Sequence, residues 1–207
     1  MDETRRQDGK QSRPPLFPVT INTARLTLRE LSLDDCADAQ VLDSDPELMR
    51  YMSADVTDEA GTRAYIEGSM ANARELPRHV FDLAITRKYE NRYIGRAGIL
   101  LTRPEHREAM LWYNVRRDLW GQGLATEASQ AMLAFAFETL AMHRVYGDAD
   151  PRNIGSLRVM EKLGMRLEAH LRENWWLRGE WCDSLIYALL EHEWRNGQNR
   201  QVRRIES

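Results

Sequence analysis

The sequence predicts an α/β fold of the α+β type, in which one mixed, mostly antiparallel sheet is flanked by helices. Two observations lead to this class. Segments with the two-residue hydrophobic period of strands alternate with segments that carry helix start and stop signals, and the elements follow the order strand, helices, three strands, helix, strand, helix and hairpin. A length of 207 residues fits one domain. We expect this domain at residues 19–194, between a polar N-terminal tail (1–18) and a polar C-terminal tail (195–207).

Local signals define the elements of the first half. Leu26 and Leu28 alternate with polar residues, as in a half-buried strand, and Ser32 with Asp35 resembles a capping box at the start of a helix. The run 87–92 is polar and indicates the turn of a hairpin. In order, we expect a strand at 25–29, a helix from Ser32 to about Leu42, a short helical piece opened by Asp45 and Pro46, a helix at about 58–74, and strands at 81–85, 93–101 and 109–115.

In the second half, glycines mark the boundaries of the predicted elements. Gly121 and Gly123 stand between the strand at 109–115 and an apolar helix that ends near Leu140. Gly164 has the position of a C-terminal glycine cap, so a second helix ends there. A strand at 144–149 separates these helices, and two last strands at 165–177 and 181–190 are joined through 178–180.

Composition excludes several classes of protein. The chain has 43% hydrophobic and 29% charged residues and a net charge of -3, so it offers no overall basic field for nucleic acid. No stretch has the roughly 20 apolar residues of a membrane helix, and the N-terminus has no signal-peptide core. Cys36 and Cys182 form no CxxC, and the histidines lack metal-ligand spacing. We therefore expect a cytoplasmic protein that uses no metal and binds neither nucleic acid nor membrane.

The segment 118–128 is the most informative part of the sequence, because it places a glycine-rich loop at a strand-to-helix junction. The first N–H groups of a helix lack internal partners and lie at its positive end, which suits a pyrophosphate. Glycines at 121 and 123 leave room for phosphates and allow unusual dihedral angles. A Walker loop is excluded because no Gly-Lys-Ser/Thr follows, and the third glycine of a dinucleotide fingerprint is missing.

This loop resembles the coenzyme A loop of the GNAT superfamily of acetyltransferases, in particular the Trp-Gly-x-Gly-x-Ala-Thr-Glu-Ala form of its ribosomal-protein N-terminal acetyltransferase branch. Residues 25–31 are similar to the opening strand of that family. Asn153, Ser156 and the run 162–165 resemble its Asn-x-x-Ser helix that ends in Lys-Leu-Gly-Phe, and 179–194 resemble its closing strand. The matches follow one another in order from about Thr23 to Trp194.

The resemblance implies a GNAT fold, acetyl-CoA as the acetyl donor and a set of cofactor-binding residues. The backbone near the end of the fourth strand would pair with the pantetheine arm where this strand diverges from the next, and loop amides would hold the pyrophosphate. An N–H there would also polarise the thioester carbonyl. The implied cofactor-binding residues are Tyr113, Asn114, Val115, Gly121, Gln122, Gly123, Leu124, Ala125, Thr126 and Asn153.

Two positions depart from the family pattern and shape the catalytic hypothesis. The usual Arg or Gln three residues before the first glycine is Asp118, so backbone amides must carry the phosphates. The usual proton-donating tyrosine is Met160, and the resemblance instead implies Ser156 as the acid that protonates the thiolate. We expect Glu127 to handle the proton of the acceptor, with other candidates at Glu30, Glu173 and Asp183. Trp175, Trp176 and Trp181 are candidate lining of an acceptor cleft.

These expectations lead to one function and two alternatives. The first is an N-acetyltransferase that moves acetyl from acetyl-CoA to a primary amine by direct attack, with a protein or peptide N-terminal α-amine as acceptor, because an α-amine is far more often neutral near pH 7.5 than a lysine. The alternatives are an acetyltransferase for a small-molecule amine and a non-catalytic acetyl-CoA-binding module. A homodimer is left open.

Overall fold

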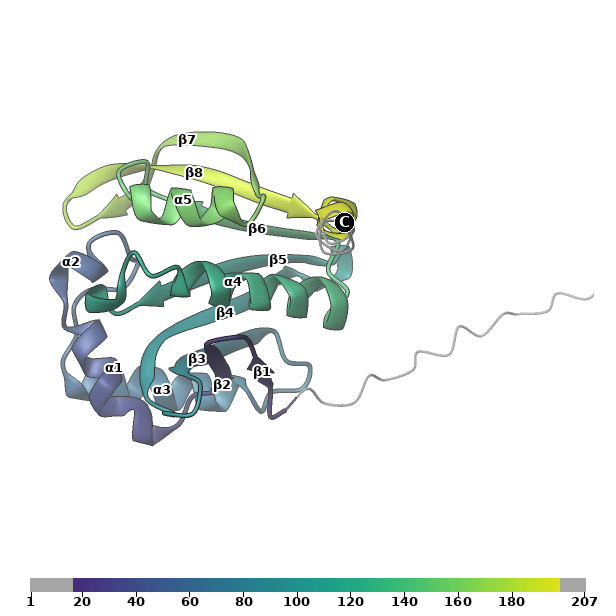
Figure 1. Ribbon diagram of the computed structural model, residues 1–207. Coiled ribbons are helices and arrows are strands. Elements are labelled where there is room, and N and C mark those ends of the chain that lie inside the picture. The colour runs from purple at the N-terminus through teal and green to yellow at the C-terminus, as the bar shows by residue number, and fades with distance from the viewer. Residues whose placement is uncertain (1–16, 198–207) are drawn as a thin grey trace, which may run out of the picture.

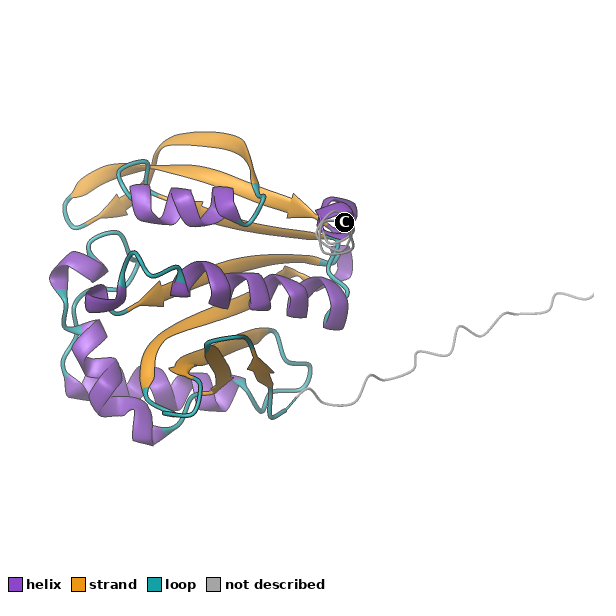
Figure 2. Ribbon diagram, viewed as in Figure 1, coloured by secondary structure: helices purple, strands orange, loops and turns teal. Residues whose placement is uncertain are grey.

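The computed structural model describes residues 17–197, which form an eight-stranded sheet with helices on both faces (Figures 1 and 2). The strand order is β1-β2-β3-β4-β5-β6-β8-β7. All neighbouring strands are antiparallel except β5 and β6. The mixed, mostly antiparallel sheet predicted from the sequence is confirmed. The predicted tails lie outside the described residues, apart from 17–18 and 195–197.

The strands agree closely with the hydrophobic alternation of the sequence. Leu26 and Leu28 are fully buried while Thr27 between them is not, as the two-residue period requires. The strands are β1 (Thr20–Asn22), β2 (Leu26–Glu30), β3 (Val80–Arg87), β4 (Tyr93–Arg103), β5 (Glu108–Val115), β6 (Arg144–Ala149), β7 (Arg166–Leu177) and β8 (Glu180–Leu190).

The helices begin at the predicted caps. The Asp35 carboxylate accepts the Ser32 N–H at 2.9 Å, and Asp58 accepts the Gly61 N–H at 2.9 Å. The helical elements are η1 (Leu33–Asp35), α1 (Cys36–Asp43), α2 (Pro46–Met49), α3 (Glu59–Asn72), η2 (Pro104–His106), η3 (Arg117–Leu119), α4 (Leu124–Ala134), η4 (Phe135–Thr139) and α5 (Ile154–Lys162). Within residues 17–197, no helix combines the length and the hydropathy needed to cross a membrane.

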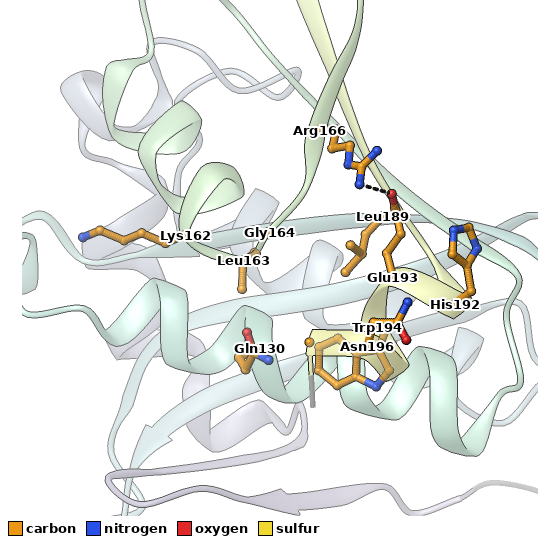
Figure 3. Close-up of a pocket in the computed structure, with 11 residues that line it drawn as sticks. Gln130, Lys162, Leu163, Gly164, Arg166, Leu189, His192, Glu193, Trp194 and Asn196 are labelled. Carbon is orange, nitrogen blue, oxygen red and sulfur yellow. Dashed lines mark ion pairs between the residues drawn. The ribbon is translucent and has the colours of Figure 1, made fainter. Parts of the chain in front are cut away.

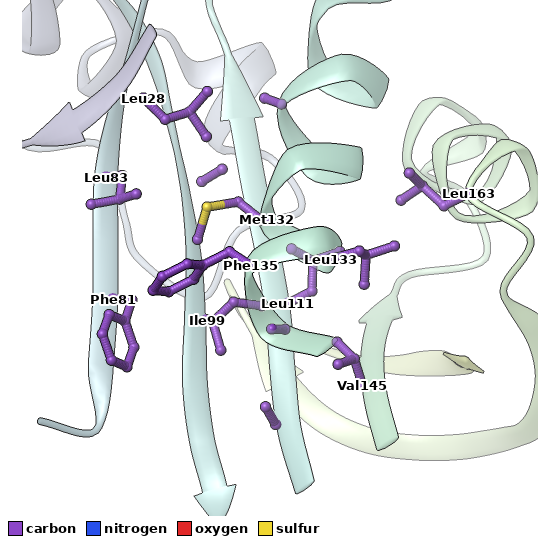
Figure 4. Close-up of a cluster of buried hydrophobic side chains, with 14 of the residues drawn as sticks. Leu28, Phe81, Leu83, Ile99, Leu111, Met132, Leu133, Phe135, Val145 and Leu163 are labelled. Atoms are coloured by element: carbon purple, nitrogen blue, oxygen red, sulfur yellow. The ribbon is translucent and has the colours of Figure 1, made fainter. Parts of the chain in front are cut away.

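Two apolar clusters fix the helices to the sheet. The larger cluster lies under α4 and α5, where Met132 and Leu133 pack against Phe81, Leu111 and Val145 of the strands (Figure 4). The smaller cluster holds α1 and α3 on the other face of β3 and β4, and its buried members include Leu42, Ile66, Ala84 and Tyr93. The two faces of the sheet are therefore covered by different helices, and each face contributes separate groups to the candidate site.

A buried polar network reinforces the face that carries α1 and α3. The Arg96 guanidinium pairs with Asp43 at 2.8 Å, and both side chains are nearly inaccessible. Tyr65 and Ser69 of α3 donate hydrogen bonds of 2.6 and 2.7 Å to Asp82 of β3. Removal of one partner from such a pair leaves an uncompensated buried charge, at a cost of about 3–5 kcal/mol. The network therefore fixes α1 and α3 in position over β3 and β4.

Five elements were not predicted, and two of them are the short 3-10 turns η2 and η3. Strand β1 has only three residues and an exposed–intermediate–exposed pattern, so its own sequence carries no alternation signal, and its pairing with β2 defines it. The helix expected to end near Leu140 changes to a π-helical turn over Phe135–Thr139. Residues 191–197 are helical and follow β8 directly.

Candidate active site

The site is built around an open seam between the two parallel strands. β5 and β6 pair over three residue positions only, and the last pair is Met110 with Tyr146. The strands are still close at the next position, because a Cβ on Gly147 would lie 3.3 Å from the Leu111 carbonyl oxygen. Beyond this point no strand pairing joins Tyr113–Val115 to β6 within the described chain. The divergence expected from the sequence is confirmed, and the seam opens toward the C-terminal ends of both strands (Figure 1).

Backbone groups of β5 point into this seam. The Arg116 N–H donates to the Ile94 carbonyl at 2.9 Å, which makes this a hydrogen-bonded pair of the antiparallel β4–β5 ladder. Since such pairs alternate along a ladder, Asn114 faces β4, whereas the main-chain groups of Tyr113 and Val115 face the seam. The Trp120 indole N–H donates to the Val115 carbonyl at 2.8 Å and anchors the following loop to the strand.

The glycine loop lies at the start of α4. Gly121 and Gly123 have φ values of 76° and 75°, in the left-handed region, and Gly123 is the N-cap of the helix. A Cβ added at Gly121 would meet no atom within 4 Å, and one at Gly123 would meet only the Arg25 guanidinium at 3.7 Å. The space in front of the helix N-terminus is thus open, as a bound phosphate requires. A non-glycine residue in this conformation costs about 1–2 kcal/mol.

Cations line a cavity beside this loop. The cavity has a volume of about 280 Å³. It is bounded by Gln122 and Leu124, by Arg25 of the β1–β2 turn, by Arg87 at the end of β3, and by Lys88 and Glu90 of the turn that follows. The Arg25 guanidinium donates to the Gln122 carbonyl at 2.9 Å and so lies directly against the loop. Sequence reasoning missed this role, because Arg25 is nearly one hundred positions from the loop.

The predicted acid, Ser156, lies on the α5 side of the seam. Asn153 is the N-cap of α5, and its side-chain oxygen accepts the Ser156 N–H at 3.1 Å. The Ser156 hydroxyl is 2.9 Å from the Tyr113 hydroxyl, which also donates to the Ser156 carbonyl at 3.1 Å. This bond spans the seam from β5 to α5. Burial raises the pKa of Tyr113 to about 12, so the phenol stays protonated at neutral pH.

Met160 occupies the position of the missing tyrosine and has a packing role. It is buried on α5, and its sulfur would lie 3.4 Å from a Cβ on Gly147. The structure thus brings together Asn153, Ser156 and Tyr113 as the polar groups on this side of the seam. Sequence reasoning assigned only a cofactor contact to Tyr113 and missed its hydroxyl.

Glu127 lies at the first turn of α4 but does not serve as a free base. Its carboxylate accepts bonds from the Thr23 hydroxyl (2.6 Å), the Arg25 N–H (2.8 Å) and the Arg25 guanidinium (2.6 Å). Although partial burial opposes the change, these hydrogen bonds and the arginine charge lower the pKa of Glu127. The contacts fit a structural role that joins the β1–β2 turn to α4, and they do not support the proton-handling role expected for Glu127.

The other candidate carboxylates are also engaged or peripheral. Glu30 pairs with Arg78 at 2.7 Å, and Asp183 pairs with His170 at 2.6 Å while accepting the Glu173 N–H at 2.8 Å. Asp118, the departure in the loop, is largely exposed and pairs with Arg116 at 3.1 Å. These carboxylates are therefore poor candidates for the group that receives the proton of an acceptor amine.

The turn of the β7–β8 hairpin is held against the segment that follows α2. Arg178 in its turn donates hydrogen bonds of 2.6–3.2 Å to the carbonyls of Arg50, Met52 and Ala54, and it pairs with Asp55 at 3.2 Å. The three tryptophans predicted to line a cleft belong to this hairpin, and all are exposed (42–59%): Trp175, Trp176 and Trp181. Trp176 and Trp181 meet edge to face with ring centroids 5.2 Å apart.

A larger cavity of about 450 Å³ lies away from the reacting groups (Figure 3). Gln130 of α4, the end of α5 at Lys162–Gly164 and the residues after β8 line it, and an Arg166–Glu193 ion pair of 2.9 Å crosses its edge. Leu189 in its wall pairs with Val145, within the part of β6 that is still joined to β5. The cavity is therefore at the closed end of the seam.

Comparisons with known proteins agree with this geometry. The family model described as an acetyltransferase (GNAT) domain matches residues 25–166. Protein p20 of Bacillus licheniformis and YnaD of Bacillus subtilis, both described as uncharacterized N-acetyltransferases, are 30% and 31% identical, and each alignment covers 84% of this chain and 98% of the relative. A solved GNAT-family acetyltransferase from Bacillus anthracis superposes with a TM-score of 0.76 at 27% identity, over 84% of this chain and 100% of that one.

Relatives with named acceptors are more distant. Spermidine N(1)-acetyltransferase of Escherichia coli is 22% identical, with 81% of this chain and 87% of the relative aligned. YdaF of Bacillus subtilis, named as a ribosomal N-acetyltransferase, is 32% identical over only 43% of this chain and 49% of its own. The shared property of these relatives is acetyl transfer to nitrogen, whereas their acceptors differ.

Proposed function

The chain belongs to the GNAT acetyltransferase family and is an acetyl-CoA-dependent N-acetyltransferase, and we propose that its acceptor is the N-terminal α-amine of a protein or peptide. The main support for this function is the seam between β5 and β6. At this opening the structure brings together a glycine loop suited to phosphates, the unpaired main chain of β5 and the hydroxyl groups of Tyr113 and Ser156.

The described residues fit acetyl-CoA. The main-chain groups of Tyr113 and the N–H of Val115 face the seam and suit the amides of the pantetheine arm, in the manner of an added strand. The amides from Gln122 to Thr126 lie at the open start of α4, and Arg87 and Lys88 beside Gln122 add positive charge for the phosphates. When bound, acetyl-CoA supplies the thioester that the amine attacks.

We assign the donation of a proton to the leaving sulfur to Ser156. Its hydroxyl is half-buried on the α5 side of the seam and is bonded to Tyr113, which can replace the proton that Ser156 gives up. Asn153 keeps its NH₂ group as a donor for the pantetheine arm, because its oxygen is occupied by the Ser156 N–H. A backbone N–H of β5 would polarise the thioester carbonyl.

The engagement of the candidate carboxylates favours an acceptor with one reacting amine over a polyamine. A polycation such as spermidine is best held by several free carboxylates at once. The carboxylates of Glu30, Glu127 and Asp183 are instead paired with Arg78, Arg25 and His170. An N-terminal α-amine presents a single charge and is neutral in about a quarter of molecules at about pH 7.5, against about 0.1% for lysine. The exposed tryptophans of the β7–β8 hairpin would contact the peptide that follows this amine.

A small-molecule amine is the second candidate, because the spermidine acetyltransferase relative aligns over most of its length. Acetyl-CoA consumption should be measured with N-terminal peptides, spermidine and an aminoglycoside, and the acetylated atom located by mass spectrometry. We expect kcat/KM to be highest for peptides and the acetyl group to be on the α-nitrogen. Preference for spermidine would refute the proposed acceptor, and no consumption with any amine would favour a binding module.

A further inference from the structure

One carboxylate at the vertex of the seam has no assigned role. Asp148 follows Gly147, the last residue of β6 that lies close to β5. It is therefore located where the strands begin to diverge, two positions beyond the last β5–β6 pair at Tyr146. At about 3.3 Å per residue, this is about 7 Å into the opening.

Asp148 faces the side of the sheet opposite Ser156. Gly147 faces α5, because a Cβ there would approach the Met160 sulfur at 3.4 Å. Successive residues of a strand point to opposite faces, so the Asp148 side chain points to the face that carries α1 and α3. Its cross-strand neighbour on that face is Ile186. The seam thus has hydroxyl groups on one side and a carboxylate on the other.

The Asp148 carboxylate is accessible but has no partner. Within residues 17–197 it makes no ion pair and no hydrogen bond to another side chain, and its own backbone N–H is the one donor that acts on it. The side chain is open to solvent, yet surrounding atoms crowd it so that burial raises the pKa of the carboxyl group. A small ligand could therefore reach this carboxylate where β5 and β6 diverge. Asp150, two residues further on, is instead held by Arg152 at 2.6 Å, which lowers its pKa.

We propose that Asp148 is the general base that receives the proton of the acceptor amine, an inference that rests on the proposed acetyl transfer through this seam. The amine approaches from the α1/α3 face as an ammonium ion, and an Asp148 carboxylate oxygen takes one of its protons. The neutral nitrogen then forms a bond to the acetyl carbon and the carbon–sulfur bond breaks. The sulfur takes a proton from Ser156, and the second proton of the nitrogen passes to water. Base and acid act from opposite faces, so neither blocks the other.

The test compares Asp148→Asn, which keeps the shape and removes the base, with wild type and with Asp34→Asn, an exposed aspartate of η1. A lost general base lowers the rate by about 10²–10⁴-fold. We expect kcat/KM of Asp148→Asn to fall at least about 100-fold near neutral pH, with acetyl-CoA affinity unchanged by thermal shift. Asp34→Asn should behave as wild type, and Asp148→Glu should recover part of the loss because it restores a carboxylate.

The pH dependence separates a base from a structural residue. The ratio of wild-type kcat/KM to that of Asp148→Asn should fall at least about tenfold as pH rises toward and past the amine pKa near 8. Above this pH the amine is already neutral when it binds, so the base is needed less. Titration of neighbouring groups should not produce this pH dependence. The strands on either side of Asp148 present neutral side chains to it, and the Arg152 guanidinium keeps Asp150 ionised because it lowers the pKa of that carboxyl group. The side chains that share its face are Arg144 and Tyr146 on β6, Asp150 directly after this strand, Met110 and Trp112 on β5, and Ser184 and Ile186 on β8.

The outcomes distinguish this inference from the proposed function. Failure of the wild type to acetylate any amine would overturn both. Wild-type turnover together with an unchanged kcat/KM in folded Asp148→Asn would overturn the inference alone. A deficit that is constant with pH, or that Asp148→Glu does not reduce, would also overturn it, because both results indicate a structural role.

Discussion

Replacement of Ser156 by alanine should slow catalysis while the fold survives, and the hydrogen bonds around it give the size of the effect. The Ser156 hydroxyl bonds the Tyr113 hydroxyl at 2.9 Å, and Tyr113 keeps a second bond of 3.1 Å to the Ser156 carbonyl after the change. No buried hydroxyl loses its last partner, so the cost is about 1 kcal/mol of unfolding free energy. In a protein of this size that lowers Tm by about 2–4 °C.

The effect on turnover should be much larger. Loss of a general acid with water as substitute lowers kcat by roughly ten- to a thousandfold, which corresponds to about 1.4–4 kcal/mol of transition-state stabilisation. The assay is steady-state release of the coenzyme A thiol, detected with a chromogenic disulfide at saturating acceptor. Acetyl-CoA affinity, measured by thermal shift, should change little, because the loop and strand contacts are intact. Asn153→Ala should show the reverse, with weaker cofactor binding.

Tyr113→Phe is the matched variant for this prediction. It removes the phenol that can reprotonate Ser156 and leaves the serine, so we expect a smaller loss of kcat than in Ser156→Ala. The double variant should be no slower than Ser156→Ala, since the two hydroxyls act in one relay. Wild-type kcat in a folded Ser156→Ala protein would refute the reasoning, and a larger loss in Tyr113→Phe would move the acid to the phenol.

The remaining predictions concern the loop and its support. Acetyl-CoA at about 1,000 times its Kd should add about 4 kcal/mol of stability to the folded protein. Gly123→Ala should abolish the resulting rise in Tm, whereas the control Gly164→Ala, at a similar φ of 78° after α5, should keep it. A rise in Tm that survives in Gly123→Ala would show that the phosphates bind elsewhere. Asp118→Arg should leave acetyl-CoA affinity equal or up to several-fold tighter, because charge effects at an exposed helix start are about 0.3–1 kcal/mol; a large loss in titrations would reveal a structural task. Glu127→Gln should lower unfolding free energy by about 1–3 kcal/mol at neutral pH with kcat nearly unchanged. Since the folded pKa of Glu127 is lowered, this difference is present above its unfolded pKa and disappears as pH falls through the folded value, which denaturant unfolding at several pH values can test.

Most of the fold could be predicted because its signals are local. Hydrophobic alternation, caps at Ser32 and Asp58 and glycines at 123 and 164 each act within a few residues, and the elements begin and end near them. The short β1 carries no such signal, because its partner strand defines it.

The site could be predicted only in part, because its decisive contacts join distant residues. The bond from Tyr113 to Ser156 spans 43 positions, and the contacts from Glu127 to Arg25 span 102. A sequence gives no register between such segments, so the engagement of Glu127 could not be foreseen. The lack of a side-chain partner for the Asp148 carboxylate within residues 17–197 likewise follows from how the strands pack, which the sequence alone does not show.

Because β5 and β6 pair over only three positions, few main-chain hydrogen bonds join the two halves of the sheet. From Tyr146 to Asp150 the arm is about 13 Å long, so a rotation of about 5° at the closed end changes the width at the mouth by about 1 Å. The bonds from Arg178 to the carbonyls of residues 50–54 join the halves at that mouth and resist this rotation. If release of the spent cofactor requires this rotation, the strength of the Arg178 hydrogen bonds would affect the turnover rate although Arg178 touches no reacting atom.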